Sequence, residues 1–250
     1  MRAIIIGAGR GQRLMPTTEN APKCFAEIRG KRILDWTVEA LEAGGVTEIC
    51  FIGGYRIESV ERAYPHFTFR HNDDWAANNI LVSLMCAEDL MDRPFVTAYS
   101  DILFTGAVVE KLIACNADIA LGIDTDWRTH YRPRSQHPPH DAEKAITANG
   151  RVQRVQRNIA YEDATGEFIG VAKFSTRGGA QLREHYHRRR REFWDRPYRE
   201  AAQFQKAYLI HLFQDMIEQG VEFGHADTHG KYREIDTQQD MDLAQKEWAP

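Results

Sequence analysis

The chain has 250 residues, of which 43% are hydrophobic and 27% charged, with a formal net charge of −4 and a pI near 6.2. This length allows one large domain with a well-buried core. The acidic balance argues against broad, nonspecific nucleic-acid binding, which needs a basic face. No apolar run approaches the roughly 20 residues of a membrane span. The short apolar run at residues 3–6 turns directly into glycines, so the amino terminus does not read as a signal peptide.

The cysteines lie far apart and include no CxxC pair: Cys24, Cys50, Cys86 and Cys115. This distribution is typical of reduced thiols in a cytosolic protein and provides no zinc signature. The histidines likewise lack an HExxH motif or other paired spacing. We therefore expect a cytoplasmic protein without a cysteine or histidine metal site.

Short apolar runs alternate with amphipathic segments through the first half of the chain. Strands are predicted at residues 3–6, 24–28, 48–52, 67–70, 94–99 and 119–123, and helices at 33–43, 79–90 and 108–114. The first of these helices is expected to end at Gly44 and Gly45. The alternating order predicts a mainly parallel sheet with helices on both faces.

The second half of the chain has a different character. A polar stretch at residues 124–141 precedes a predicted hairpin of residues 143–147 and 152–156, joined at Asn149-Gly150. Further strands are predicted at 168–174, 221–224 and 232–236, and helices at 179–191, at 204–219 and after residue 236. Because we find no repeat and no low-complexity linker, we predict one domain over residues 1–250, with residues 124–175 as an inserted arm.

A glycine-rich loop directly follows the first strand and consists of Gly7, Ala8, Gly9, Arg10 and Gly11. Glycines allow close approach of a ligand, and their N–H groups can bind phosphate oxygens. A P-loop is excluded because no GK[ST] follows, and a dinucleotide fingerprint fails because Gln12 stands where the third glycine is needed. Two interpretations remain: a loop that wraps a nucleoside triphosphate, with Arg13 and Lys23 on its phosphates, or a glycine turn beside two solvated cations.

The wider motif comprises Gly9, Gly11, Arg13, Leu14, Pro16, Thr18, Pro22 and Lys23. It resembles the signature of the nucleotidyltransferase superfamily, which makes nucleotide sugars and CDP-activated headgroups. Only Gln12 departs from it, replacing a small hydroxyl residue. The resemblance implies an α/β, GT-A-like fold with a Rossmann-like mixed sheet and an inserted β-arm. It also implies that the glycine loop binds the nucleotide, while Arg13 and Lys23 neutralise the triphosphate and the leaving pyrophosphate.

Two aspartates are the candidate metal ligands. Asp101 follows the predicted strand 94–99, at the sheet edge where ligands bind in open α/β folds, although an aspartate there could also serve as a helix cap or turn residue. Asp236 ends the run Tyr232-Arg233-Glu234-Ile235-Asp236, which resembles that of cytidylyltransferases acting on phosphocholine and small phosphonates. By this resemblance Asp101 and Asp236 share Mg²⁺, and we give Glu234 a minor role.

The segment containing Asn78, Asn79 and Ser83 bears on the choice of base. Asparagine suits a helix cap and also suits hydrogen bonding to a pyrimidine edge. The segment resembles the Asn-Asn-Ile-x-x-Ser run of bacterial phosphocholine cytidylyltransferases, and it replaces the proline-glycine segment of sugar nucleotidyltransferases. This favours CTP over dTTP or UTP.

The polar arm is the candidate acceptor site. Acidic and aromatic residues there can hold a cationic amine, and arginines can hold an acidic group. Similar cytidylyltransferases have an Asp–Trp pair and an acid at corresponding places, while a solvated surface excursion is the structural alternative. The acceptor-binding residues that we predict are Asp124, Trp127, Tyr131, Arg132, Glu143 and Gly170.

These observations predict transfer of CMP from CTP to a small phosphate or phosphonate acceptor, such as phosphocholine, 2-aminoethylphosphonate or a phosphorylated amino acid. A sugar-1-phosphate nucleotidyltransferase using UTP, dTTP or GTP and a catalytically silent nucleotide-binding regulator remain as alternatives. The basic run at residues 185–191 is interpreted as a solvated helix face, so neither nucleic acid nor membrane is an expected partner. The sequence leaves the oligomeric state open, a homodimer included.

Overall fold

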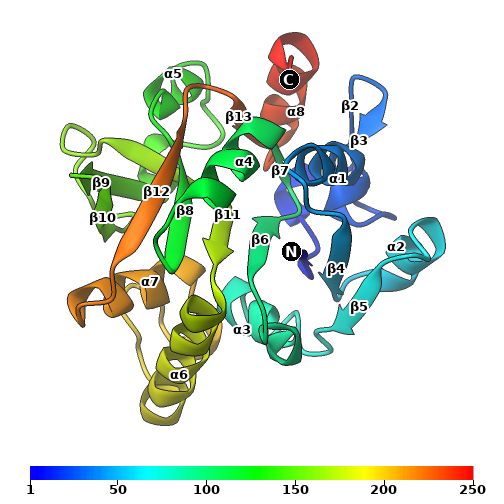
Figure 1. The fold of residues 1–250 in the computed structure, drawn as a ribbon. Coiled ribbons are helices and arrows are strands. Elements are labelled where there is room, and N and C mark those ends of the chain that lie inside the picture. The colour runs from blue at the N-terminus through cyan, green and yellow to red at the C-terminus, as the bar shows by residue number, and fades with distance from the viewer. Residues whose placement is uncertain (250) are drawn as a thin grey trace.

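The computed structural model describes residues 1–249 and has a nine-stranded mixed sheet as its centre (Figure 1). The first half of the chain supplies four neighbouring parallel strands, in the order β5 (Thr68–His71), β4 (Glu48–Gly53), β1 (Arg2–Gly7) and β6 (Phe95–Tyr99). Residues 3–6 of β1 are all buried, as expected for a parallel strand covered on both faces. Four of the six strands predicted for the first half thus form the expected parallel sheet.

The chain after residue 118 continues the sheet beyond β6 in mixed orientation. The order is β11 (Gly166–Phe174), β8 (Ile119–Asp124), β12 (Phe223–Thr228), β10 (Arg151–Val155) and β9 (Lys144–Ala148). Strands β9 and β10 are the predicted hairpin, and β9 also pairs with the start of β11. These five strands therefore form a closed ring of neighbours, which completes the Rossmann-like mixed fold with a β-arm.

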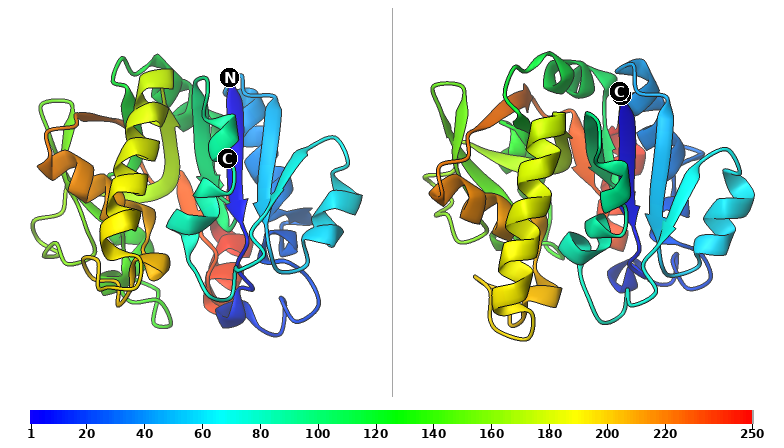
Figure 2. Two further views of the ribbon diagram at one scale, coloured as in Figure 1. Left: turned by 90° about the horizontal axis from the view of Figure 1, so that it is seen from below. Right: turned by 60° about the horizontal axis from the view of Figure 1, so that its bottom comes forward.

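Helices cover both faces of the sheet (Figures 1 and 2). One face carries α1 (Ile33–Ala43), α2 (Ile57–Ala63) and α4 (Gly106–Ala114), and the other carries α3 (Ile80–Met85), α6 (Thr176–Phe193) and α7 (Leu209–Glu218). Successive side chains of β1 point to opposite faces, so Ile5 packs in the first core and Ile4 and Ile6 in the second. Each helix layer is held by its own apolar cluster.

Two small sheets bring the carboxyl-terminal segment to the amino-terminal half. Strand β7 (Ile102–Phe104) pairs with β13 (Tyr232–Glu234), and β2 (Glu27–Ile28) pairs with β3 (Lys31–Arg32). Helix α8 (Gln238–Glu247) packs beside them through a third cluster containing Ala244 and Leu103. This packing places the segment that follows β13 directly beside the end of β6.

Several predicted elements differ from the observed ones. The strand predicted at 24–28 is a 3₁₀ turn, Lys23–Phe25, followed by β2, and the helix predicted at 79–90 becomes α3 and a separate turn, Glu88–Leu90. The helix predicted at 204–219 begins only at Leu209, and the strand predicted at 221–224 is β12. Helix α2 was not predicted because only Ile57 and Val60 on it are buried, which leaves little amphipathic pattern.

No helix or strand was predicted within the polar stretch 124–141. It contains a short helix, α5 (Trp127–Tyr131), and a 3₁₀ turn, Pro139–Asp141. An apolar cluster of Trp127, Tyr131 and three residues from the following segment stabilises this region. Among residues 1–249, no helix combines the length and apolarity needed to cross a bilayer.

Candidate active site

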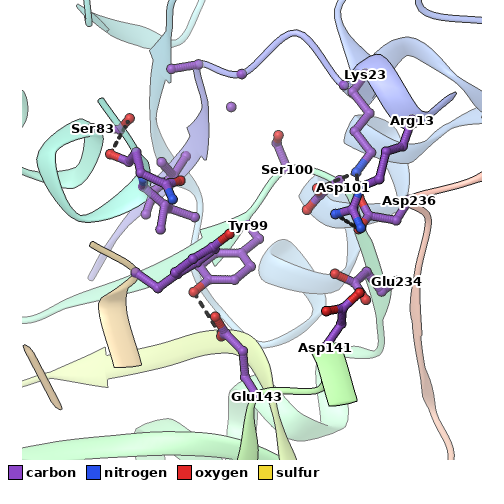
Figure 3. Close-up of a pocket in the computed structure, with 18 of the residues that line it drawn as sticks. Arg13, Lys23, Ser83, Tyr99, Ser100, Asp101, Asp141, Glu143, Glu234 and Asp236 are labelled. Carbon is purple, nitrogen blue, oxygen red and sulfur yellow. Dashed lines mark hydrogen bonds and ion pairs between the residues drawn. The ribbon is translucent and has the colours of Figure 1, made fainter. Parts of the chain in front are cut away.

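A cavity of about 240 Å³ opens at the carboxyl ends of β1 and β6, where open α/β sheets bind their ligands (Figure 3). Residues from both ends of the chain line it. They include every residue predicted for the nucleotide and for catalysis: Gly7, Ala8, Gly9, Gly11, Arg13, Lys23, Asn78, Asn79, Ser83, Asp101 and Asp236. The structure therefore brings all these side chains and backbone segments into one space.

Gly11 shapes the loop that follows β1. Its φ of 69° is in the left-handed region, and a β-carbon there would lie 3.0 Å from the side chain of Lys23. The Thr18 hydroxyl donates a hydrogen bond to the Gly11 carbonyl over 2.8 Å, which fastens the loop. A side chain at residue 11 would therefore strain the backbone and displace Lys23.

Lys23 links the two predicted metal ligands. Its ammonium donates to Oδ2 of Asp101 over 2.7 Å and also to Oδ1 of Asp236, whose other oxygen pairs with Arg13. Burial alone would lower the pKa of Lys23, but the two carboxylates raise it above its ordinary value. Burial would raise the pKa of Asp236, yet Lys23 and Arg13 lower it. The Lys23 and Asp236 side chains are therefore charged at neutral pH.

Backbone pairing brings these two aspartates together across more than half the chain. Strand β13 pairs antiparallel with β7, and the amide of Ile235 donates to the carbonyl of Asp101 over 2.9 Å. The amides of Asp236 and Thr237 donate to the carboxylate of Asp240, over 3.1 and 2.8 Å, at the start of α8. Asp236 is thus held between a strand end and a capped helix.

The oxygen donors of Asp101 and Asp236 fit a hard divalent cation, because both carboxylates already converge on one cationic group. Glu234 also lines the cavity, and burial followed by the neighbouring Asp236 charge raises its pKa well above the ordinary value. An additional cation would relieve this crowding of negative charge. The minor role predicted for Glu234 therefore underestimates its place at the site.

A second grouping of potential metal ligands consists of His137, Glu234 and Asp236, whose ligand atoms lie within 4.8 Å of one another. The Nδ1 atom of His137 is 2.6 Å from a guanidinium nitrogen of Arg134. Burial lowers the pKa of His137 to about 4, and the Arg134 charge adds to this effect. The arginine therefore occupies the ring nitrogen that faces the carboxylates of Glu234 and Asp236.

The two asparagines of this segment have different hydrogen-bond partners, which the sequence did not reveal. Asn79 caps α3, with its side-chain oxygen accepting from the Ile80 amide over 2.8 Å. Asn78 forms two reciprocal amide hydrogen bonds, of 2.7 and 2.9 Å, with buried Asn72, which also donates to Ser83. Asn78 keeps one donor and one acceptor position unused at the cavity, so it is the best placed of the three to contact a base.

The remaining wall of the cavity contains residues that were not predicted for it: Trp75, Tyr99, Ser100, Asp141, Arg157, Glu167, Phe168, Tyr208 and Tyr232. Tyr99 donates to Oε2 of Glu143 over 3.2 Å. Burial raises the pKa of Glu143 and of Glu167 to about 7. Tyr99 could have been found from its position just before Ser100-Asp101, whereas Arg157 lies in a loop without a recognisable pattern.

The predicted acceptor residues fall into two groups. Glu143 lines the cavity, but Trp127 is fully buried in the cluster beneath the arm, and the carboxylate of Asp124 accepts from the amides of Asp126 and Gly230. Tyr131 is also buried and donates to Glu167 over 2.6 Å, so it supports a cavity residue from behind. These three residues were expected to contact the acceptor directly. That expectation is corrected, because their side chains are engaged in local packing and hydrogen bonds.

The two other acceptor residues also lie outside the cavity lining. The side chain of Arg132 is exposed to solvent. Gly170 has a φ of 78°, and a β-carbon there would lie 2.5 Å from the Tyr99 ring. Gly170 therefore makes room for Tyr99 in place of contacting an acceptor.

Residues 3–191 match the model of the MobA-like NTP transferase domain. The chain belongs to this family. It is 29% identical to the CTP:phosphoglutamine cytidylyltransferase of Campylobacter jejuni, with 97% of this chain and 98% of that protein covered. It is also 32% identical to the choline-phosphate cytidylyltransferase of Streptococcus pneumoniae, with 42% and 46% covered. The resemblance to cytidylyltransferases predicted from the motifs is thus confirmed.

The solved structures agree on the fold. The inositol-1-phosphate CTP transferase from T. maritima superposes with a TM-score of 0.73 at 19% identity, covering 100% of this chain and 98% of the other. A glucose-1-phosphate thymidylyltransferase from Bacillus anthracis, described as putative, gives 0.75 at 16% identity, covering 100% and 97%. The nucleotidyltransferase fold expected from the sequence is therefore confirmed.

Proposed function

We propose that the protein transfers CMP from CTP to a small acceptor bearing a phosphate or phosphonate, with Mg²⁺ as the metal and pyrophosphate as the second product. The whole chain would act as one nucleotidyltransferase domain. The main observation behind this proposal is a cluster of charged residues beside the glycine loop in one cavity: Arg13, Lys23, Asp101 and Asp236. The full-length similarity to a CTP-dependent relative supports CTP as the donor.

The reaction needs no protein nucleophile. A phosphate or phosphonate oxygen of the acceptor is ionised near neutral pH and forms a bond to the α-phosphorus of CTP. The bond from that phosphorus to the oxygen bridging the β-phosphorus breaks, and its electron pair leaves with pyrophosphate. Catalysis then consists of positioning the reactants and stabilising the developing charge.

Each charged residue has a defined part in this scheme. Lys23 is fixed by burial and faces the phosphates as a permanent cation, while the Arg13 side chain, which pairs with Asp236, is 59% exposed and can turn from that acid to the triphosphate. The backbone of the glycine loop supplies N–H donors. Asp101 and Asp236 would hold Mg²⁺, which when bound supplies positive charge to the phosphate oxygens.

Asn78 supports the preference for a pyrimidine base because its side chain is held rigidly by Asn72 and retains free hydrogen-bonding positions. All four cysteines are free thiols, which supports a cytoplasmic location, where thiols stay reduced.

The test is pyrophosphate release from CTP, UTP, ATP, GTP and dTTP, each with Mg²⁺ and with phosphocholine, 2-aminoethylphosphonate, phosphoglutamine and sugar-1-phosphates. We expect release with CTP and a non-sugar acceptor, abolished in Asp101→Asn but retained in Asp242→Asn, which changes an exposed acid on α8. Release with a sugar-1-phosphate and another nucleotide would replace the proposed substrates while keeping the catalytic residues. Full activity of Asp101→Asn would refute the assignment of the site.

A further inference from the structure

Arg157 is a cation at the cavity wall that the reaction scheme does not use. Its Nε is buried and has no hydrogen-bond partner among residues 1–249, and Oε1 of Glu143 is 3.9 Å from Nη2, beyond hydrogen-bond distance. The guanidinium lies over the ring of Tyr208, 4.0 Å from its centroid. Arginine stacked in this way keeps its planar edge of N–H donors free for an anion.

The other two cations at the cavity are already engaged. Lys23 and Arg13 both pair with Asp236 at the metal end of the site. Glu143 and Tyr99 lie apart from that end, and from Ser83 at the proposed base end (Figure 3). Since Arg157 accompanies Glu143, it faces the part of the acceptor that points away from the reacting phosphorus.

Glu143 is the complementary acid. It is 7% exposed and receives a single hydrogen bond, from Tyr99, so most of its lone pairs lack a donor. Six carboxylates and three cations line the cavity: Asp101, Asp141, Glu143, Glu167, Glu234 and Asp236 against Arg13, Lys23 and Arg157. An ammonium group of the acceptor would therefore be stabilised at Glu143.

We propose that the acceptor is a phosphorylated α-amino acid, whose ammonium group binds Glu143 and whose carboxylate binds Arg157. This inference rests on the proposed function and deepens it. The wall presents a carboxyl group and a guanidinium 3.9 Å apart, and an α-amino acid presents an ammonium and a carboxylate on a single carbon. A zwitterion of this kind can therefore satisfy both groups at once.

Acceptors without a carboxylate meet only half of this requirement. Phosphocholine and 2-aminoethylphosphonate would leave the Arg157 donors desolvated and unpaired when they fill the cavity. A buried polar group left without its partner is the feature by which binding sites reject analogues most strongly. Arg157 is thus assigned as a residue that sets acceptor specificity, and Glu143 as its partner in that role.

The experiment compares three matched acceptors with CTP and Mg²⁺: glutamine phosphorylated on its side-chain amide, the same compound lacking the carboxylate (phosphorylated 4-aminobutanamide), and the same compound lacking the amine (phosphorylated glutaramate). We expect kcat/KM for the zwitterion to exceed that for either analogue by about 100-fold. Equal or better use of 4-aminobutanamide phosphate, phosphocholine or 2-aminoethylphosphonate overturns the inference while leaving cytidylyl transfer intact. If CTP gives no pyrophosphate release with any acceptor, both the inference and the proposed function are overturned.

Variants test the residues themselves. Arg157→Gln should lower the preference for the zwitterion over the carboxylate-free analogue by about 100-fold. Glu143→Gln should lower the preference over the amine-free analogue. The matched control is Arg154→Gln, which changes an exposed arginine on β10 outside the cavity and should keep the wild-type preference. CTP affinity, measured by calorimetry, checks that each variant is folded; a folded Arg157→Gln enzyme with an unchanged preference overturns the assignment.

Discussion

Lys23 Nζ lies 2.7 Å from Oδ2 of Asp101, although 78 positions separate the two residues in the chain. The same ammonium contacts Asp236, so it neutralises the buried carboxylate of Asp236 and the half-buried carboxylate of Asp101, which would otherwise repel each other. Lys23 is therefore a structural cation for the acids, in addition to the phosphate contact that we propose for it. This double role has a measurable consequence for stability.

The Lys23→Met variant should be destabilised by about 2–4 kcal/mol at pH 7 without metal, because buried charges lose their partner. Mg²⁺ should restore more stability to this variant than to the wild type, since the aspartate pair then lacks its resident cation. Urea unfolding with and without Mg²⁺ measures both effects. Lys246→Met, at an exposed position of α8, is the control; equal stability of the two variants would contradict the role given to Lys23.

The two neighbouring asparagines should respond differently to truncation. Asn79→Ala removes the cap of α3 and should cost about 1 kcal/mol of stability with little change in the preference for CTP over UTP. Asn78→Ala leaves the cap in place and should weaken CTP binding by about 10-fold, which corresponds to the net value of a hydrogen bond or two.

Calorimetric titration with CTP and UTP, together with thermal unfolding, separates these outcomes. Each variant serves as the control for the other, because the residues are adjacent in sequence. A loss of nucleotide preference in Asn79→Ala at unchanged stability would contradict the roles inferred from the hydrogen bonds, in which Asn79 caps α3 and Asn78 contacts the base.

Much of the nucleotide site could be predicted from the sequence because its residues belong to local motifs. The loop residues Gly11 and Arg13 are close in the chain, and Lys23 follows at a characteristic spacing. Asp236 was predicted from its resemblance to a family run, but its approach to Asp101 depends on pairing between β7 and β13, which local sequence does not determine.

The acceptor wall was predicted less well for a physical reason. Arg157 and Asn72 are single polar residues in loops. Only tertiary packing brings them into contact with their partners, Tyr208 and Asn78. Trp127 was assigned to the acceptor because acidic and aromatic residues can hold a cationic amine and because similar cytidylyltransferases have an Asp–Trp pair at the corresponding place. The structure instead surrounds it with Ala142, Ile159 and Ala164, which form a small core that is invisible until these segments meet.

Glu143 should make acceptor binding depend on pH. Burial raises its pKa to about 7, so the carboxylate that would bind an ammonium is incompletely ionised near neutrality. The KM for the acceptor should therefore fall as the pH rises from 6 to 8. In Glu143→Gln the part of this pH dependence that comes from Glu143 should be lost. Initial rates at saturating CTP measure it; an unchanged profile in Glu143→Gln would exclude this residue as the titrating group.

The same raised pKa affects folding in the absence of ligands. A carboxyl group with a pKa near 7 when folded and near 4.5 when unfolded binds more protons in the folded state, so stability is lost as the pH rises from about 4.5 to about 7 and is constant above. Glu143→Gln should remove about 3 kcal/mol of this loss. Urea unfolding at pH 5 and pH 8 gives the difference. In the Glu143→Gln variant a loss of stability of similar size should remain, because burial also raises the pKa of Glu167 to about 7.

Trp127 should matter for stability and not for acceptor recognition. The side chain is fully buried, packs edge-on against Tyr131 and Tyr161, and lies outside the cavity lining. Trp127→Ala should lower the free energy of unfolding by about 3–5 kcal/mol because it leaves a large void. Trp127→Phe fills most of that void and should keep the acceptor KM within about twofold of the wild type. An acceptor KM raised tenfold or more in a stable Trp127→Phe enzyme would instead restore the direct contact predicted from the sequence, since the indole would then have to reach the cavity during turnover.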